Sequence, residues 1–109
     1  MELNVEVSQP STDETVLALT GSLDLTSRDQ LIEAGGKALT EGSISRLVLD
    51  LAGLTFMDST GIGAVVEVAG GASDRGVAFA LRSPSERIFR VLQLTGMADL
   101  WPIESAPQT

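Results

Sequence analysis

The chain has 109 residues, with 15 acidic and 7 basic side chains and a formal charge of −8. At this length we expect one compact domain that buries about 65% of the surface of its unfolded chain. The net acidity argues against nucleic acid as a partner. No apolar run approaches the roughly 20 residues that cross a bilayer, so we expect no membrane insertion and a cytoplasmic protein. Histidine and cysteine are both absent, which excludes zinc sites of the usual kind, thiol catalysis and disulfides, and we expect no metal or cofactor.

Two strands are predicted at the start of the chain. Residues 3–8 alternate between apolar and polar side chains, which is the period of a strand with one solvated face. Residues 15–20 are nearly all apolar, as in a more central strand, and a polar turn at residues 9–14 separates the two. The pair predicts an antiparallel hairpin with the first strand at an edge of the sheet.

The first helix is predicted to start near Ser27. Ser27 and Gln30 have the spacing of a capping box, with the serine at N-cap and the glutamine at N3. The buried face of this helix is predicted to consist of Leu31, Gly35, Ala38 and Leu39. Gly35 and Gly36 each weaken the helix by roughly 1 kcal/mol relative to alanine. We expect a close approach of this helix to the sheet as the compensation.

Apolar runs at residues 46–51 and 77–81 predict strands that are covered on both faces. Residues 59–72 lie between them, where valines favour a strand but the length and the Asp-Ser-Thr start favour a helix. A final helix is predicted to begin with Ser83 at N-cap and to end at Gly96. We expect one domain over residues 1–103 and a frayed tail over residues 104–109.

The alternation of strands and helices predicts an α/β domain. Its central sheet is mostly parallel, with an N-terminal antiparallel edge strand and with helices packed against it. In such a sheet, function collects beyond the carboxyl ends of the strands. Polar loops are predicted at that edge over residues 23–27 and 55–61. Parallel neighbouring strands would place Asp24 and Ser59 at the same edge.

These loops resemble those of a known family. The run Phe56-Met-Asp-Ser-Thr-Gly61, preceded by Gly21-Ser-Leu-Asp24, resembles the bacterial anti-sigma factor antagonists, whose fold is the STAS domain. Residues 83–89 and 94–97 are similar to the last helix of that family and its exit, so the resemblance covers roughly residues 3–103.

The resemblance implies a regulatory switch. In that family a partner anti-sigma factor, which is also a serine kinase, phosphorylates the serine that corresponds to Ser59. The unphosphorylated protein binds the anti-sigma factor and releases the sigma factor, and a serine phosphatase resets the phosphorylated form. The residues implied to contact the partner are Asp24, Asp58, Ser59, Thr60 and Gly61. A phosphate on Ser59 would be tolerated at the positive end of a helix.

Each site residue also has a plainer interpretation. Ser59 can be only an N-cap, because serine before an apolar helix most often is one. Asp24 can satisfy backbone amides of its loop, and Asp58 can be a turn residue. Thr60 is the nearest rival of Ser59 as the phosphate acceptor.

Gly61 and Gly63 are interpreted as packing glycines rather than a phosphate cradle, because no basic residue follows them as in a nucleotide-binding loop.

Two other classes of function are open to this sequence. One is a STAS interaction module of a stress-signalling scaffold or an accessory subunit of a membrane transporter. The other is an enzyme that uses Ser59 as a nucleophile. That enzyme would lack a base, because the chain has no histidine and its lone lysine, Lys37, lies far along the first helix. The sequence therefore favours a regulatory binding protein that is not an enzyme.

Overall fold

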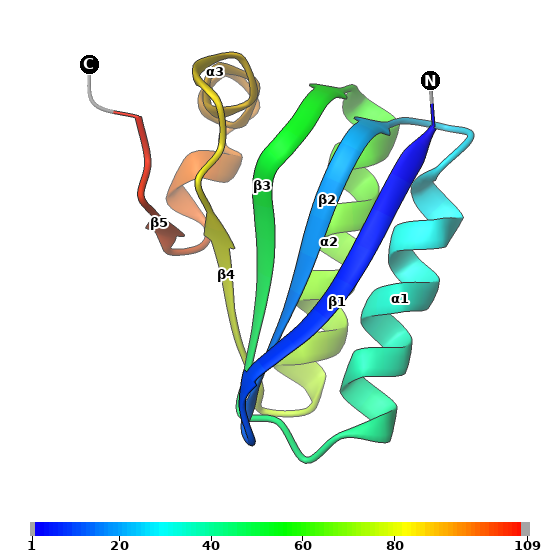
Figure 1. The fold of residues 1–109 in the computed structure, drawn as a ribbon. Helices are drawn as coiled ribbons and strands as arrows, with labels where there is room; N and C mark the ends of the chain where they lie inside the picture. The colour runs from blue at the N-terminus through cyan, green and yellow to red at the C-terminus, as the bar shows by residue number, and fades with distance from the viewer. Residues whose placement is uncertain (1, 108–109) are drawn as a thin grey trace.

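A sheet of five strands forms the centre of the protein, in the order β1-β2-β3-β4-β5 (Figure 1). The computed structural model describes residues 2–107. The strands are β1 (Leu3–Ser11), β2 (Glu14–Leu23), β3 (Arg46–Met57), β4 (Ala78–Arg82) and β5 (Ile103–Glu104). β1 is antiparallel to β2, and every other neighbouring pair is parallel. This confirms the predicted α/β fold with an antiparallel edge strand at the N-terminus.

Helices cover one face of this sheet. α1 (Arg28–Glu41) and α2 (Ser59–Asp74) lie side by side behind the strands, whereas α3 (Glu86–Leu94) lies beyond the end of β4 and contacts β3 (Figure 1). The short 3-10 helix η1 (Met97–Asp99) follows α3 and leads to β5. Within residues 2–107, no helix is both long enough and apolar enough to cross a membrane.

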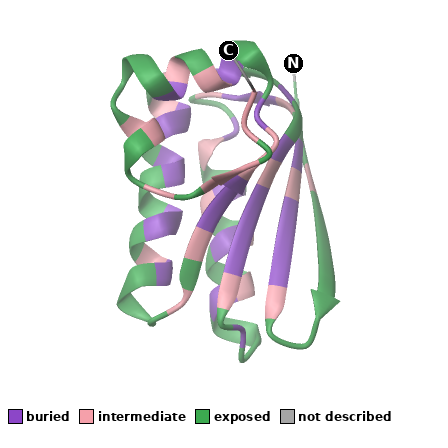
Figure 2. Ribbon diagram, turned by 90° about the vertical axis from the view of Figure 1, so that its left-hand side faces the viewer, coloured by how far each residue is buried: buried purple, intermediate pink, exposed green. Residues whose placement is uncertain are grey.

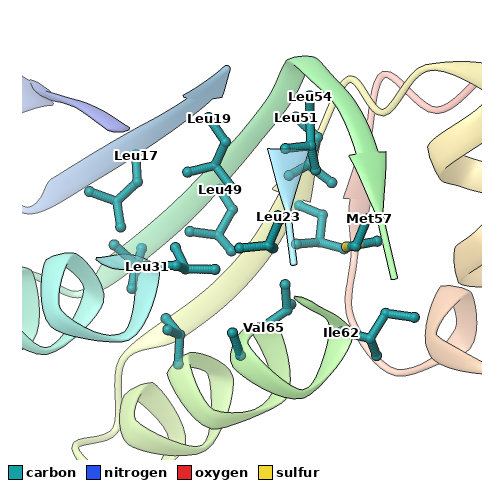
Figure 3. Packing of buried hydrophobic residues seen from close by; sticks show 14 of the residues in the cluster. Leu17, Leu19, Leu23, Leu31, Leu49, Leu51, Leu54, Met57, Ile62 and Val65 are labelled. Carbon is teal, nitrogen blue, oxygen red and sulfur yellow. The ribbon is translucent and has the colours of Figure 1, made fainter. Parts of the chain in front are cut away.

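The main core lies between the sheet and the two long helices. Leucines at alternate positions of the central strands point toward Leu31 of α1 and toward Ile62 and Val65 of α2 (Figure 3). Buried residues follow the inward sides of the helices and the central strands, whereas the far end of the edge strand is exposed (Figure 2). The fully buried leucines of β2, β3 and β4 are Leu17, Leu19, Leu23, Leu47, Leu49, Leu51, Leu54 and Leu81.

Among residues 2–107 no helix packs on the second face of the sheet (Figure 1), although the central strands are buried on both faces, as predicted. Val16, Val48 and Ala80 form a separate buried cluster there. Ion pairs lie on the same face, because side chains two residues apart in a strand point to the same side of the sheet. Glu14 lies two residues before Val16, Arg46 two residues before Val48, and Arg82 two residues after Ala80. Arg46 bonds both Glu14 and Glu104, and Arg82 bonds Glu104 at 3.1 Å. In the strand register Arg46 lies on one side of Val48 and Ala80, and Glu104 lies on the other, so the ion pair between Arg46 and Glu104 spans the cluster.

The start of α1 differs from the prediction. Ser27 stands at the N-cap position, but its side chain makes no capping hydrogen bond. Its hydroxyl donates to the carbonyl of Ser22 at 2.9 Å, and the Gln30 amide donates to the carbonyl of Leu3 at 2.9 Å. The predicted capping box is therefore wrong, because both side chains bond the strands instead.

Gly35 of α1 allows close packing against another helix. The predicted close approach to the sheet is therefore wrong. A Cβ atom at Gly35 would lie 2.8 Å from a methyl carbon of Val68 in α2. The neighbouring Gly36 is exposed and has nothing within 4 Å of such an atom. Close packing of α1 on α2 therefore accounts for the first of the two glycines and leaves the second unexplained.

β3 is longer than predicted. It runs to Met57, through residues that were predicted to be a loop, and its register with β2 shifts twice. One shift lies between Ala18 and Thr20 of β2 and the other between Gly21 and Ser22. Each shift adds a residue to β3, so the apolar alternation that marks a strand is lost although the strand continues.

The C-terminal elements also shift by a few residues. Ser85, not Ser83, caps α3, because its hydroxyl accepts the N–H of Ile88 at 3.2 Å. The predicted stop at Gly96 is confirmed, with a left-handed φ of 78°. β5 includes Glu104, one residue beyond the predicted end of the domain, and residues 108–109 of the predicted tail lie outside the described residues.

Candidate functional site

The loops that follow β2 and β3 meet at the carboxyl edge of the sheet. Leu23 pairs with Met57 in the parallel register of the two strands. The N–H of Asp58 lies 3.4 Å from the carbonyl oxygen of Leu23. The structure thus places Asp24 and Ser59 at the same edge, as the sequence predicts.

Asp58 begins α2. Its Oδ1 atom accepts the Thr60 hydroxyl at 2.6 Å and the Gly61 N–H at 2.9 Å, so Asp58 is the N-cap of the helix. These two hydrogen bonds stabilise the carboxylate and hold the pKa of Asp58 below its usual value, although partial burial and the like charge of Asp24 act to raise it. Asp58 therefore has a structural role, as the cap of α2 rather than as a turn residue.

Ser59 is the first residue of α2 and is exposed to solvent. Within residues 2–107 its hydroxyl makes no hydrogen bond, whereas the Thr60 hydroxyl beside it is engaged by Asp58. The interpretation of Ser59 as an N-cap is wrong, because Asp58 fills that position. Its hydroxyl is thus available for reaction at the positive end of a helix of 16 residues.

Gly61 is buried, unlike the other four predicted site residues. A Cβ atom there would lie 2.3 Å from the carbonyl oxygen of Leu23, so only glycine lets α2 start against the end of β2. Gly61 thus shapes the site from inside, as a packing glycine. Gly63 is exposed with nothing within 4 Å of such an atom, so the packing interpretation is wrong for Gly63.

The carboxylate of Asp24 is held by the loop that follows it. Its Oδ1 atom accepts the Thr26 hydroxyl at 2.7 Å, the Thr26 N–H at 3.0 Å and, more weakly, the Ser27 hydroxyl at 3.3 Å. Led by the Thr26 hydroxyl, these bonds lower the pKa of Asp24 from its usual value. Asp24 therefore does satisfy its own loop, and it stays ionised at neutral pH.

Sequence reasoning missed the part that Thr26 and Ser27 play at this site. A signal for it exists, since Asp-x-Thr occurs in both loops, as Asp24-Leu-Thr26 and Asp58-Ser-Thr60. In each copy the threonine hydroxyl bonds the aspartate two residues before it. Leu25, the central residue of the first copy, is 69% exposed, and Phe56 near the end of β3 is 43% exposed. The site thus combines two ionised carboxylates with exposed apolar side chains.

Comparison with known proteins identifies the family. Residues 7–102 match the family described as Mlab, STAS domain. The chain belongs to the STAS domain family. It is 30% identical over 105 residues to the anti-sigma-B factor antagonist of Bacillus subtilis, which covers 96% of this chain and 94% of that protein. It is 28% identical over 106 residues to the protein of the same name from Listeria monocytogenes, covering 96% and 91% of the two chains. These relatives confirm the resemblance to anti-sigma factor antagonists.

Solved STAS structures share the fold. The anti-sigma factor antagonist SpoIIAA in its unphosphorylated form matches with a TM-score of 0.80 and 22% identity, over 94% of this chain and 89% of that one. A sulfate transporter family protein from Wolinella succinogenes matches with a TM-score of 0.69 and 20% identity, over 82% of this chain and 74% of that one. The STAS fold of this chain thus occurs in proteins of different function.

Proposed function

We propose that this STAS domain is an anti-sigma factor antagonist that is switched by phosphorylation of Ser59. The unphosphorylated form binds an anti-sigma factor that is also a serine kinase, and the bound sigma factor is released. Phosphorylation of Ser59 ends this binding, and a serine phosphatase restores it. The observation that carries the proposal is the exposed hydroxyl of Ser59 at the start of α2, which bonds none of the residues that the structure describes.

The geometry favours Ser59 over Thr60 as the phosphate acceptor. The Thr60 hydroxyl donates to Asp58 at 2.6 Å, and transfer of a phosphoryl group to this hydroxyl would remove the proton and break the bond that orients the helix cap. Ser59 has no such bond within residues 2–107, so its modification leaves the cap in place. We therefore expect one phosphate per chain, on Ser59.

A phosphate on Ser59 should act on the partner rather than on the fold. It would bring about −1.5 to −2 charges to a surface that already carries Asp24 and Asp58. The start of α2 tolerates this charge, since the positive end of the helix dipole lies beside it. A desolvated partner surface offers no counter-ion prepared for it, so the partner is released.

The same observations argue against an enzyme. The chain has no histidine or cysteine, and Lys37 lies in the third turn of α1, far from the start of α2. Both carboxylates at the site have pKa values below the usual range, which makes them poor bases for a serine hydroxyl.

A docking module of a transporter or signalling scaffold is the second candidate. The likeness to a sulfate transporter family protein supports it at the level of the fold. The relatives that match over nearly the whole chain, however, are anti-sigma-B factor antagonists. A module used only for docking also has no need of a free serine hydroxyl at a helix start.

Incubation of the chain with a candidate anti-sigma factor and ATP, followed by intact-mass and peptide analysis, tests the proposal. We expect one phosphate, mapped to Ser59, and no labelling of Ser59→Ala. A phosphopeptide that maps to Thr60, with Ser59→Ala still fully labelled, would contradict the assignment.

Calorimetry against the same partner tests the switch. Ser59→Asp should lose about 30- to 4,000-fold in affinity, because an unpaired charge enters a desolvated surface. Ser59→Ala should bind nearly as well as the unmodified chain. Ser73→Asp, which adds the same charge to an exposed position near the far end of α2, serves as the control and should bind normally. If Ser59→Asp binds like the unmodified chain and Ser59→Ala does not, the switch is not electrostatic.

A further inference from the structure

The side chain of Ser27 does not make the hydrogen bond that is usual at its position in the fold. It occupies the N-cap position of α1, where a serine hydroxyl normally bonds a free backbone N–H of the helix. Here the hydroxyl instead donates to the carbonyl of Ser22 at 2.9 Å and accepts the backbone N–H of Asp24 at 3.0 Å. The same oxygen lies 3.3 Å from Oδ1 of Asp24. Ser27 therefore fastens Asp24 to the end of β2 and leaves its own helix without a side-chain cap.

The loop around Asp24 is closed by further bonds. The N–H groups of Ser27 and Arg28 donate to the main-chain carbonyl of Asp24, at 3.2 Å and 2.9 Å. The Thr26 hydroxyl and N–H donate to Oδ1, while Oδ2 makes no hydrogen bond within residues 2–107. One carboxylate oxygen is thus fixed by the loop, and the other remains able to accept a hydrogen bond from outside.

We propose that Ser27 is a positioning residue of the Ser59 site, which holds the Asp24 carboxylate ready to accept a hydrogen bond from the anti-sigma factor. The inference rests on the proposed function for the identity of that partner. Ser27 itself is only 4% exposed, so a docked protein cannot use its hydroxyl directly. Ser27 bonds Asp24, which is half-buried at the rim of the site, so Asp24 is the residue through which Ser27 acts on binding.

Fixing the carboxylate beforehand has a consequence for affinity. A side chain that is already ordered loses little conformational freedom when the partner binds, so more of the interaction energy appears as affinity. Without the Ser27 hydroxyl, the loop loses its bonds to the end of β2, and part of its order would have to be gained during binding. The effect of Ser27 should therefore disappear when Asp24 has no acceptor to offer.

A double-mutant cycle on the full chain tests this dependence by calorimetry against the anti-sigma factor. Asp24→Asn keeps the shape of the side chain but replaces one carboxylate oxygen with an NH₂ group, which donates hydrogen bonds and does not accept them. It should weaken binding by about tenfold or more. Ser27→Ala alone should weaken binding by about tenfold. In the Asp24→Asn background, the same change should cost less than about twofold. Losses that simply multiply would overturn the proposal.

A control variant separates positioning from general destabilisation. Ser85→Ala removes the capping hydroxyl of α3, which accepts the N–H of Ile88 at 3.2 Å and lies outside the site. It should leave affinity within about twofold of the unmodified chain. If Ser27→Ala does not fold, Ser27→Cys keeps the volume but has only weak hydrogen bonds, and takes its place in the cycle.

A measurement on the free protein keeps the two proposals distinguishable. The pKa of Asp24, followed by carbon NMR of its carboxyl group, should lie below the usual value and should rise in Ser27→Ala. An unchanged Asp24 pKa would overturn the positioning role, even if the partner binds as proposed. If no anti-sigma factor binds the unmodified chain while the Asp24 pKa responds to Ser27, the proposed function fails and the positioning of Asp24 stands.

Discussion

The loops after β2 and β3 contain the same local hydrogen bond, but the bonded aspartate has a different structural role in each loop. In both, a threonine hydroxyl donates to the aspartate two residues earlier, at 2.7 Å for Thr26 and 2.6 Å for Thr60. Asp58 goes on to cap α2 through the Gly61 N–H. Asp24 caps no helix and instead closes a turn that Ser27 anchors to β2.

The difference shows what each loop contributes. The residue between aspartate and threonine is exposed in both loops, an apolar Leu25 in one and a free Ser59 in the other. The second loop builds the start of a helix and offers a hydroxyl at its positive end. The first loop offers a fixed carboxylate and an apolar side chain beside it. One loop can thus be modified while the other keeps its shape.

The largest expected effect comes from the contact that joins the two loops. Gly61→Ala places a methyl group 2.3 Å from the carbonyl oxygen of Leu23, which is part of the rigid backbone. We expect a loss of about 3 kcal/mol in the free energy of unfolding. The melting temperature should fall by roughly 12 °C or more.

Gly63→Ala is the matched control in the same helix, because the methyl group enters open space. It should stabilise the free chain by roughly 1 kcal/mol. Thermal unfolding followed by circular dichroism compares the two variants. Similar shifts in melting temperature would mean that α2 does not start against Leu23 as described.

The next largest effect comes from replacing each aspartate, which distinguishes the structural role of one loop from the binding role of the other. Asp58→Ala removes the cap of α2 and should cost about 1 kcal/mol in the free energy of unfolding. Asp24→Ala should change the melting temperature less, since it caps no helix, yet it should weaken partner binding or phosphorylation. Equal losses of melting temperature and binding in Asp24→Ala would assign Asp24 a structural role only.

The smallest effect concerns acid pH. The pKa of Asp58 is lower in the folded chain than its usual value of 3.8, so this group stabilises the fold above that pH. The contribution is lost as the pH falls through the lowered pKa of the folded state. Asp58→Asn keeps a good cap but removes the titration, and its stability should depend less on pH below about pH 4. Urea unfolding at several pH values measures this, and an equal or steeper acid dependence would contradict it.

Much of the fold follows from local patterns in the sequence. Periodicity and glycine chemistry predict the hairpin, the burial of Leu31, Gly35 and Leu39, and the stop at Gly96. Ala38, which was predicted on the same buried face, is only partly buried. The placement of Asp24 beside Ser59 follows from the parallel order of β2 and β3. The resemblance in the Phe56–Gly61 segment added the serine that no pattern distinguishes from a cap.

The errors share a physical cause, which is competition from groups that the local pattern does not reveal. Ser27 looks like a cap until the carbonyl of Ser22 and the turn at Asp24 claim its hydroxyl. Gly35 was predicted to allow a contact with the sheet, but it packs against Val68 of α2. β3 looks shorter because its two register shifts disturb the alternation of side chains. Ser22 and Asp24 are near Ser27 in the sequence and Val68 is far from Gly35, but neither helix periodicity nor capping spacing reveals these contacts.

The ion pairs on the helix-free face have a consequence for synthesis on the ribosome. Arg46 and its partner Glu104 are 58 positions apart in the chain. At about 5–20 residues per second, Glu104 is made roughly 3–12 s after Arg46. During that interval Arg46 has Glu14 but lacks its second carboxylate, and Val48 lies under an incomplete cover. The nascent domain can therefore pack its helices before it can close the opposite side of its own sheet.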